Sequence, residues 1–308
     1  MTKIFIDGSA GTTGLRIYER LESRNDIELI RLSEELRKDT NARKAALNQA
    51  DIAFLCLPDS AAIEAVSLAE NGNTVIIDTS TAHRTNPDWA YGFPELSAER
   101  EQKIAVSKRI AVPGCHASGF ISLVFPLIKA GILDKNALLT CFSVTGYSGG
   151  GKKMIAEYES EERDPLLSAP RQYGIAQKHK HLPEMTAVCG LDNSPAFSPV
   201  VADFYSGMTV TVPLFKAQIN GTAEDIKKIY KEKYNSSVVR YKEDFDESGF
   251  VSANRLSGKD SMEISVSGNE DRILLVSRYD NLGKGASGAA VECMNIVMGV
   301  DKTTGLEL

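Results

Sequence analysis

Short, almost wholly apolar runs alternate with segments of helical spacing over the first third of the chain. The runs that this pattern predicts as buried strands are residues 4–7, 27–32, 52–57, 74–78 and 110–112. Helices are predicted after the first strand, over residues 15–21, and after the third, over residues 60–70. Apolar strands that alternate with helices are typical of a parallel sheet covered on both faces.

The pattern changes beyond residue 126, where longer strands with alternating apolar and polar positions appear. The predicted strands are residues 138–146, 202–214, 262–267 and 272–279. A helix over residues 223–234 follows Thr222, and Asp225 three positions later gives a partial capping box. This region therefore predicts an α+β fold with a mixed or antiparallel sheet.

Two domains are expected from the length of 308 residues. A glycine-rich loop over residues 281–288 leads into an amphipathic helix, which we expect to pack on the first domain. The predicted fold is α/β, with an N-terminal Rossmann-type parallel-sheet domain (residues 1–114 and 285–308) and a second α+β domain (residues 115–284).

A glycine-rich turn joins the first strand to the first helix. Asp7 ends the strand, and glycines follow at positions 8, 11 and 14. The spacing is GxxGxxG rather than the commoner GxGxxG. Glycines at such a turn let the backbone approach a pyrophosphate at the helix N-terminus, although any tight strand–helix turn also favours them.

Basic residues follow the second strand, where an NAD site usually has an acid that binds the ribose. Arg31 and Ser33 stand there, with Arg37 and Lys38 close behind and two glutamates between them. This composition favours NADP. Alternatively, Ser33 is the N-cap of a solvated helix.

Cys115 follows the apolar run 110–112 and a Pro-Gly break, and a helix is predicted to begin at or just after it. Helix N-termini lower the pKa of a thiol and favour the nucleophilic thiolate. The alternative is a small buried apolar residue, as free cysteines usually are.

Other polar groups fall at predicted strand ends and loops. Arg84 closes a polar run that leaves the sheet at the edge where ligands bind, and it either pairs with an anion or is a surface residue. A constrained loop is predicted over residues 91–96, and residues 146–151 form an anion-binding turn or a plain loop. His179 and His181 suit general acid/base catalysis. No further Cys/His cluster completes a metal site, so no metal is predicted.

Charge and cysteine content argue against some classes of binding partner and indicate a cellular location. With 35 basic and 41 acidic residues and no basic stripe, the chain is not expected to bind nucleic acid or an anionic membrane. No apolar run reaches membrane-spanning length, and the N-terminus lacks a secretory signal. Five widely spaced cysteines without a CxxC pair suggest neither disulfides nor zinc, so a cytoplasmic location is expected.

A dinucleotide fold, an activated cysteine and a histidine in the second domain together predict one chemistry. A thiolate attacks an activated acyl group or an aldehyde, and a nicotinamide exchanges hydride with the adduct. The chain resembles the N-acetyl-gamma-glutamyl-phosphate reductases in the shorter of their two sequence types, within the wider group of aspartate-semialdehyde and glyceraldehyde-3-phosphate dehydrogenases. The resemblance spans the chain and rests on residues 8–14, 78–84, 91–96, 113–115, 146–151, 179–184 and 281–288.

The resemblance implies a reaction of arginine biosynthesis, EC 1.2.1.38. Cys115 would attack the γ-acyl phosphate and expel phosphate, NADPH would deliver hydride to the thioester, and N-acetyl-glutamate semialdehyde would leave. His181 would be the acid/base, with His179 as the reserve. After the cysteine the family often has an aromatic, a small residue and threonine; here His116, Ala117 and Ser118 stand there, and His116 has no explanation from the sequence.

The resemblance also implies which residues bind ligands. Around the pyrophosphate it implies Gly8, Ser9, Gly11, Thr12, Thr13 and Gly14. At the 2′-phosphate it implies Ser33 with Arg31 or Arg37, and beside the nicotinamide Gly146, Ser148, Gly149 and Asn281. For the anionic groups of an acyl phosphate or semialdehyde substrate it implies Arg84, Arg171 and His179. A homodimer or homotetramer is expected.

Three alternatives remain open. A related semialdehyde dehydrogenase would act on aspartyl phosphate or alpha-aminoadipyl phosphate. A cysteine hydrolase would need no dinucleotide, which the glycine turn counts against. An inactive NADP-binding regulator would have lost the cysteine or the histidine, and both are present.

Overall fold

The computed structural model describes residues 1–308, and the chain folds into two compact units. The first unit comprises Met1–Gly114 and Ala286–Leu306, so the chain returns to it near its end. The second comprises Cys115–Gly285 with the last two residues, Glu307–Leu308. In neither unit is any helix long and apolar enough to cross a membrane.

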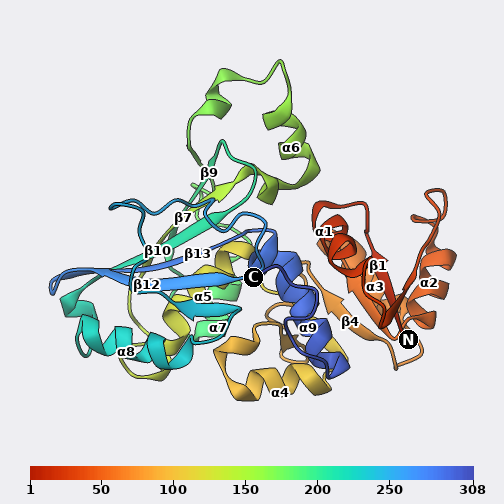
Figure 1. The fold of residues 1–308 in the computed structure, drawn as a ribbon, viewed down its shortest axis with the longest axis horizontal. Coiled ribbons are helices and arrows are strands. Elements are labelled where there is room, and N and C mark those ends of the chain that lie inside the picture. The colour runs from red at the N-terminus through yellow and green to blue at the C-terminus, as the bar shows by residue number, and fades with distance from the viewer. The chain divides into compact units, whose positions relative to one another are not determined.

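A six-stranded parallel sheet forms the centre of the first unit, with strand order β2-β1-β3-β4-β6-β5 (Figure 1). Its strands are β1 (Thr2–Asp7), β2 (Ile27–Ile30), β3 (Ile52–Leu55), β4 (Val75–Asp78), β5 (Ala90–Tyr91) and β6 (Arg109–Ala111). The predicted parallel sheet is confirmed. Only β5 was not predicted as a strand, because two residues carry no readable pattern.

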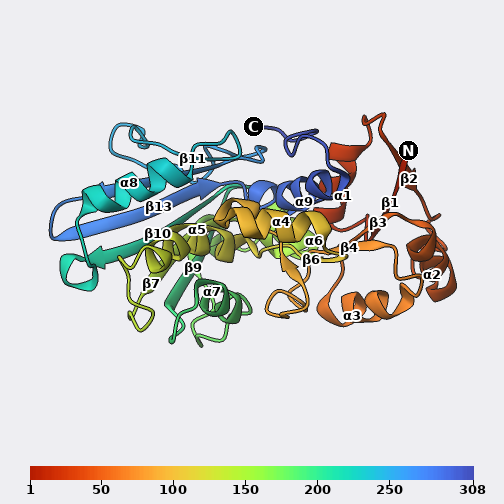
Figure 2. The same ribbon diagram turned by 90° about the horizontal axis from the view of Figure 1, so that it is seen from below.

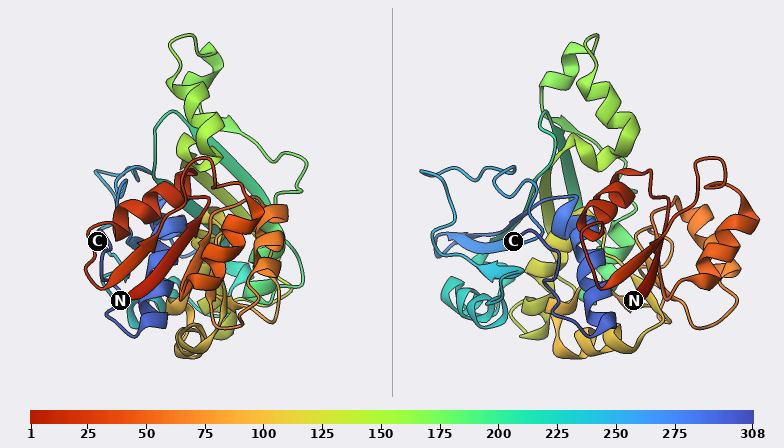
Figure 3. Two further views of the ribbon diagram at one scale, coloured as in Figure 1. Left: turned by 90° about the vertical axis from the view of Figure 1, so that its right-hand side faces the viewer. Right: turned by 45° about the vertical axis from the view of Figure 1, so that its right-hand side comes forward.

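Helices cover both faces of this sheet, as predicted. They are α1 (Thr12–Leu21), α2 (Thr40–Gln49), α3 (Asp59–Leu68), α4 (Ala98–Val106) and α9 (Gly288–Met298). One apolar core joins the sheet to α1, α4 and α9, and a second joins the opposite face to α2 and α3. Figure 3 shows α1 and the pair α2 and α3 on opposite sides of the strands.

One open alternative and one prediction about these helices were wrong. Asp39, not Ser33, caps α2, because its side chain accepts the Ala42 N–H, whereas Ser33 precedes a turn. The last helix, α9, is not amphipathic: its residues 288–295 are all buried, including the polar Glu292 and Asn295. It lies inside the core of the first unit rather than on its surface.

The second unit is built on a mixed seven-stranded sheet, with order β11-β12-β13-β10-β7-β9-β8. Its strands are β7 (Thr140–Gly146), β8 (Arg171–Gln172), β9 (Ala196–Ala202), β10 (Met208–Phe215), β11 (Val239–Tyr241), β12 (Met262–Gly268) and β13 (Arg272–Tyr279). The pairs β7/β9 and β11/β12 are parallel and the others antiparallel. The predicted mixed sheet is confirmed.

The strand predicted over residues 202–214 starts later, as β10 at Met208; residues 196–202 form a separate strand, β9, which was not predicted, and a turn joins the two. Gly207 has φ +122°, a conformation that side-chain-bearing residues rarely adopt, and a Cβ there would lie 2.5 Å from the Ala253 carbonyl oxygen. This break lets β9 and β10 pair with opposite edges of β7.

Helices of the second unit are α5 (Cys115–Lys129), α6 (Gly151–Glu159), α7 (Leu182–Cys189) and α8 (Ala223–Lys233). Figure 2 shows α5 and α8 lying against the same face of the sheet. The predicted capping box of α8 is confirmed, because Thr222 and Asp225 bond each other's backbone N–H groups. Helix α6 projects from the sheet (Figures 1 and 3).

Candidate functional site

In the first unit, the turn after β1 has a geometry that only glycine fits. Gly8 has φ +85°, and a Cβ there would lie 2.3 Å from the Cys56 carbonyl oxygen. A Cβ at Gly14 would lie 2.4 Å from the Gly8 carbonyl oxygen. Helix α1 begins at Thr12 without a side-chain cap, and the buried Thr12 hydroxyl has no hydrogen-bond partner. Uncapped N–H groups beside an orphaned hydroxyl suit a bound phosphate.

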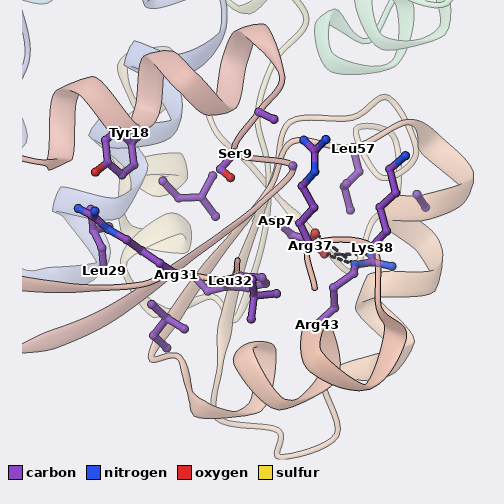
Figure 4. Close-up of a pocket in the computed structure, with 16 residues that line it drawn as sticks. Asp7, Ser9, Tyr18, Leu29, Arg31, Leu32, Arg37, Lys38, Arg43 and Leu57 are labelled. Atoms are coloured by element: carbon purple, nitrogen blue, oxygen red, sulfur yellow. Dashed lines mark hydrogen bonds and ion pairs between the residues drawn. The ribbon is translucent and has the colours of Figure 1, made fainter. Parts of the chain in front are cut away.

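A cavity of about 460 Å³ opens beside this turn, lined by residues 8–10, the end of β2 and the segment that follows it. Four basic side chains line it, those of Arg31, Arg37, Lys38 and Arg43 (Figure 4). Arg31 lies over the ring of Tyr18, 5.1 Å from its centroid. The first three were singled out from the sequence, and the structure places all four around one cavity.

Arg43 was not identified from the sequence, because α2 was not predicted. Its guanidinium contacts the buried carboxylate of Asp7 at 2.9 Å and Glu64 at 3.2 Å. Burial raises the pKa of Asp7, and the Arg43 charge opposes that rise. Ser33 does not line the cavity, but its carbonyl oxygen accepts the Arg37 N–H and so fixes the turn that carries Arg37.

In the second unit, Cys115 is the first residue of α5, so the predicted helix start is confirmed. The π-helical turn Gly283–Ser287 passes close to it, because a Cβ at Gly285 would lie 3.1 Å from the Cys115 Cβ. A helix that begins at the cysteine directs its first backbone N–H groups and its dipole at that end.

The four residues expected beside a nicotinamide lie close together in this unit. The Asn281 side chain accepts the Gly207 N–H at 2.9 Å and donates to the Ser148 hydroxyl at 3.0 Å. A Cβ at Gly149 would lie 3.4 Å from the Asn281 Nδ2, and one at Gly146 would clash with the Tyr205 carbonyl. The segment is a 3₁₀ turn tied to the backbone at residues 204 and 205 rather than a loose loop.

Three histidines form a cluster in the same unit. The ring centroid of His116 lies 5.6 Å from those of both His179 and His181, and the latter two are 4.7 Å apart. Phe197 packs against His116 and His179. His179 Nδ1 accepts the backbone N–H of His181 at 3.2 Å, which fixes the orientation of the ring.

His116, which the sequence left unexplained, has a hydrogen-bond partner at each of its ring nitrogens. Its Nδ1 lies 2.7 Å from the Ser143 hydroxyl and its Nε2 lies 2.6 Å from the Tyr173 hydroxyl. Burial raises the pKa of Tyr173, and the nearby Cys115 charge adds to this. Tyr173 and Ser143 were missed by sequence reasoning, since neither lies in a motif.

Burial controls the charge of two of these histidines. It lowers the pKa of His116 to about 3, with a smaller contribution from His179. It lowers the pKa of His179 to about 4, helped by the Lys180 charge. Both imidazoles are therefore neutral near pH 7 and act as hydrogen-bonding groups.

Arg84 and Arg171, the two arginines expected to bind the substrate, lie in different environments. Arg84 donates from Nε to the Val112 carbonyl and from Nη2 to the Thr79 carbonyl, both at 2.8 Å. These bonds favour a structural role at the turn that follows β6. Arg171 is exposed on the edge strand β8. No group of three or more Cys, His, Asp or Glu side chains is arranged to hold a metal.

Family models of known proteins match both units. Residues 3–104 match the model described as semialdehyde dehydrogenase, NAD binding domain, and residues 115–281 match semialdehyde dehydrogenase, dimerisation domain. Proteins of Brucella ovis and Brucella abortus named N-acetyl-gamma-glutamyl-phosphate reductase are 46% identical over 306 residues, covering 96% of this chain and 99% of theirs.

Solved structures are similar in fold at low sequence identity. Aspartate semialdehyde dehydrogenase II of Vibrio cholerae, complexed with ASA, aligns with TM-score 0.70 and 16% identity over 97% of this chain and 98% of that one. Aspartate semialdehyde dehydrogenase of Francisella tularensis aligns with TM-score 0.72 and 16% identity over 97% of this chain and 100% of that one.

The pKa of His116 makes stability depend on pH. Its folded-state value of about 3 lies below the ordinary 6.5, so the unfolded chain protonates first and stability falls as pH drops from about 6.5 towards 3. At pH 5 the protonation of His116 in the unfolded chain lowers the free energy of unfolding by about 2 kcal/mol. We therefore measure the free energy of unfolding in urea at pH 7 and at pH 5. Between these two values the wild-type protein should lose about 2 kcal/mol more than His116→Phe, which lacks the imidazole. Parallel losses in the two proteins would contradict the buried, neutral imidazole.

Proposed function

The chain belongs to the semialdehyde dehydrogenase family of oxidoreductases, and on that premise we propose that it reduces N-acetyl-gamma-glutamyl phosphate to N-acetyl-glutamate semialdehyde and phosphate with NADPH. This is the reaction EC 1.2.1.38, in cytoplasmic arginine biosynthesis. The identity of 46% to reductases of that name, over almost the full length of both chains, supports the substrate. The observation that carries the chemistry is Cys115 at the N-terminus of α5, in one unit with a cluster of three histidines.

We assign the nucleophile to Cys115. Its thiolate attacks the γ-acyl carbon, the carbon–oxygen bond to phosphate breaks, and a thioester forms with release of inorganic phosphate. NADPH, when bound, supplies the hydride that reduces the acyl group. Collapse of the thiohemiacetal then breaks the carbon–sulfur bond, releases the semialdehyde and returns the thiolate of Cys115.

We assign proton transfer to His181. Hydride addition leaves an oxyanion on the thiohemiacetal; His181 donates a proton to it as an acid and takes the same proton back as a base when the thiohemiacetal collapses. His179 is poorly suited to donate a proton near neutral pH, because burial lowers its pKa to about 4. A neutral His179 is instead suited to hydrogen bonding with the substrate, and the His181 N–H that it accepts fixes its ring. For the anionic groups of the substrate, Arg171 is the remaining arginine candidate.

Residues of the first unit fit a dinucleotide. The pyrophosphate would lie at the uncapped start of α1, against the orphaned Thr12 hydroxyl. The residues in this assignment are Gly8, Ser9, Gly11, Thr12, Thr13 and Gly14. Arg37 and Lys38 would bind the 2′-phosphate that distinguishes NADPH from NADH, with Ser33 fixing their turn. Gly146, Ser148, Gly149 and Asn281 would border the nicotinamide.

A homodimer or homotetramer is the assembly we propose, formed through the second sheet. On the face opposite α5, the side chains of Phe142 and Leu274 are 47% and 40% exposed, and Phe215 at the end of β10 is 64% exposed. In the pairing of β10 with β13, Pro213 lies opposite Leu274. Contiguous apolar surface of this kind is typical of protein interfaces.

The reverse reaction tests the function directly. Wild type should reduce NADP with N-acetyl-glutamate semialdehyde only when phosphate is present, and Cys115→Ser should lower kcat by at least about 10³-fold, since the nucleophile is gone. Cys141→Ser is the matched control, because burial raises the pKa of that thiol and keeps it inert.

Other outcomes of this assay separate the alternatives. Turnover of aspartate semialdehyde or an α-aminoadipate analogue alone would keep the mechanism and overturn the substrate. Binding of NADPH without any turnover would favour a regulator. Hydrolysis of an acyl substrate without NADPH binding would favour a cysteine hydrolase.

The cofactor assignment has its own test. Arg37→Ala removes a charged donor, so KM for NADPH should rise by about 10- to 100-fold while KM for NADH stays unchanged. Lys44→Ala is the control, since Lys44 pairs with Glu70 and does not line the cavity. An equal rise for both cofactors would place Arg37 away from the 2′-phosphate.

A further inference from the structure

One side chain bonds to both ends of the first turn of α5. The Tyr279 hydroxyl donates to the Cys115 carbonyl oxygen at 2.5 Å and accepts the Gly119 N–H at 3.0 Å. Residues 115 and 119 are four apart, and a bond between their backbone groups is the one that closes the first turn of an α-helix. The hydroxyl therefore acts on the turn that begins with the proposed nucleophile.

Gly119 is what admits the hydroxyl to this position. A Cβ there would lie 2.6 Å from the Tyr279 oxygen, 2.7 Å from the Ser277 Oγ and 2.5 Å from a methyl of Val210. Any larger residue would have to displace one of these groups from the buried interface between α5 and the sheet. The glycine and the tyrosine thus form a matched pair from distant parts of the chain.

Tyr279 is held firmly and stays protonated. Its side chain is fully buried as the last residue of β13. Burial raises the pKa of Tyr279 well above its ordinary value, and the nearby Cys115 charge raises it further. The hydroxyl is therefore a permanent donor to the Cys115 carbonyl and a permanent acceptor for the Gly119 N–H.

The residues that follow Tyr279 fix the rest of this region. The Asp280 carboxylate accepts the Gly258 and Leu282 N–H groups, and Asn281 bonds to Ser148 and Gly207. The C-terminal end of β13 therefore fixes both the backbone of Cys115 and the 3₁₀ turn expected beside the nicotinamide.

We propose that Tyr279 is a positioning residue for Cys115: its hydroxyl sets the first turn of α5 so that the sulfur and the helix N–H groups keep the geometry that activates the thiolate. The proposal rests on the proposed function for the role of Cys115. It differs from a general anchoring of β13 to α5, because it predicts an effect on the reactivity of one sulfur.

The test is Tyr279→Phe, which removes one oxygen atom and keeps the buried ring. Without the hydroxyl, the Gly119 N–H and the Cys115 carbonyl bond each other directly, and the turn shifts. We expect kcat to fall about 10- to 100-fold with KM for NADPH unchanged. Alkylation of Cys115 by iodoacetamide, followed by peptide mass spectrometry, should slow, and its rate–pH profile should move to higher pH.

The chain provides matched controls on the same helix. Tyr234 and Tyr230 are also buried, and their hydroxyls donate to the Ser122 and Leu123 carbonyl oxygens of α5, beyond the first turn. Tyr234→Phe and Tyr230→Phe should lower the unfolding midpoint about as much as Tyr279→Phe does. They should leave kcat and the alkylation profile of Cys115 at wild-type values.

Two results would overturn the proposal. One is a wild-type kcat and alkylation profile in Tyr279→Phe. The other is an equal change of the alkylation profile in all three variants, which would mean that loosening α5 anywhere is enough. Alkylation needs no substrate or cofactor, so this readout remains decisive even if the proposed reaction fails in wild type.

Discussion

The chemistry proposed for the second unit depends on how the first turn of α5 is held. Cys115 and Tyr279 are 164 positions apart in sequence, yet a hydrogen bond joins them at the helix start. A helix terminus has unpaired N–H groups and a partial positive charge whatever its sequence, but their direction is useful only if the turn is fixed. Gly119 makes room for the tyrosine, and His116, the next residue after the cysteine, is fixed by Ser143 and Tyr173. Neighbouring residues of one turn are thus held by partners from three other segments, those that contain Ser143, Tyr173 and Tyr279.

Charge is distributed differently in the two units. The cavity of the first unit is lined by cationic side chains, of which Arg43 alone is neutralised by a buried carboxylate, that of Asp7. In the second unit, burial instead keeps two histidines neutral: it lowers the pKa of His116 to about 3 and that of His179 to about 4. A cationic cavity suits a phosphate-bearing cofactor, and neutral imidazoles suit hydrogen bonding near a thiolate.

Local patterns in the sequence predicted what depends on local physics. The parallel strands, the helix start at Cys115 and the capping box at Thr222 were all predicted, because each is set by a few adjacent residues. Features set by distant contacts were not. Helix α2 buries only Arg43, Ala46 and Leu47, too few positions to give a readable period. The break at Gly207 and the contacts of Tyr173 and Tyr279 depend on partners that no spacing reveals.

In the proposed reaction, Cys115 carries the acyl group as a thioester. Incubation with N-acetyl-gamma-glutamyl phosphate in the absence of NADPH, followed by acid quench and peptide mass spectrometry, tests it most directly. We expect an added N-acetyl-glutamyl group on the peptide that contains Cys115, with release of one phosphate per chain. An unmodified Cys115, or the same mass on Cys56, Cys141, Cys189 or Cys293, would contradict it.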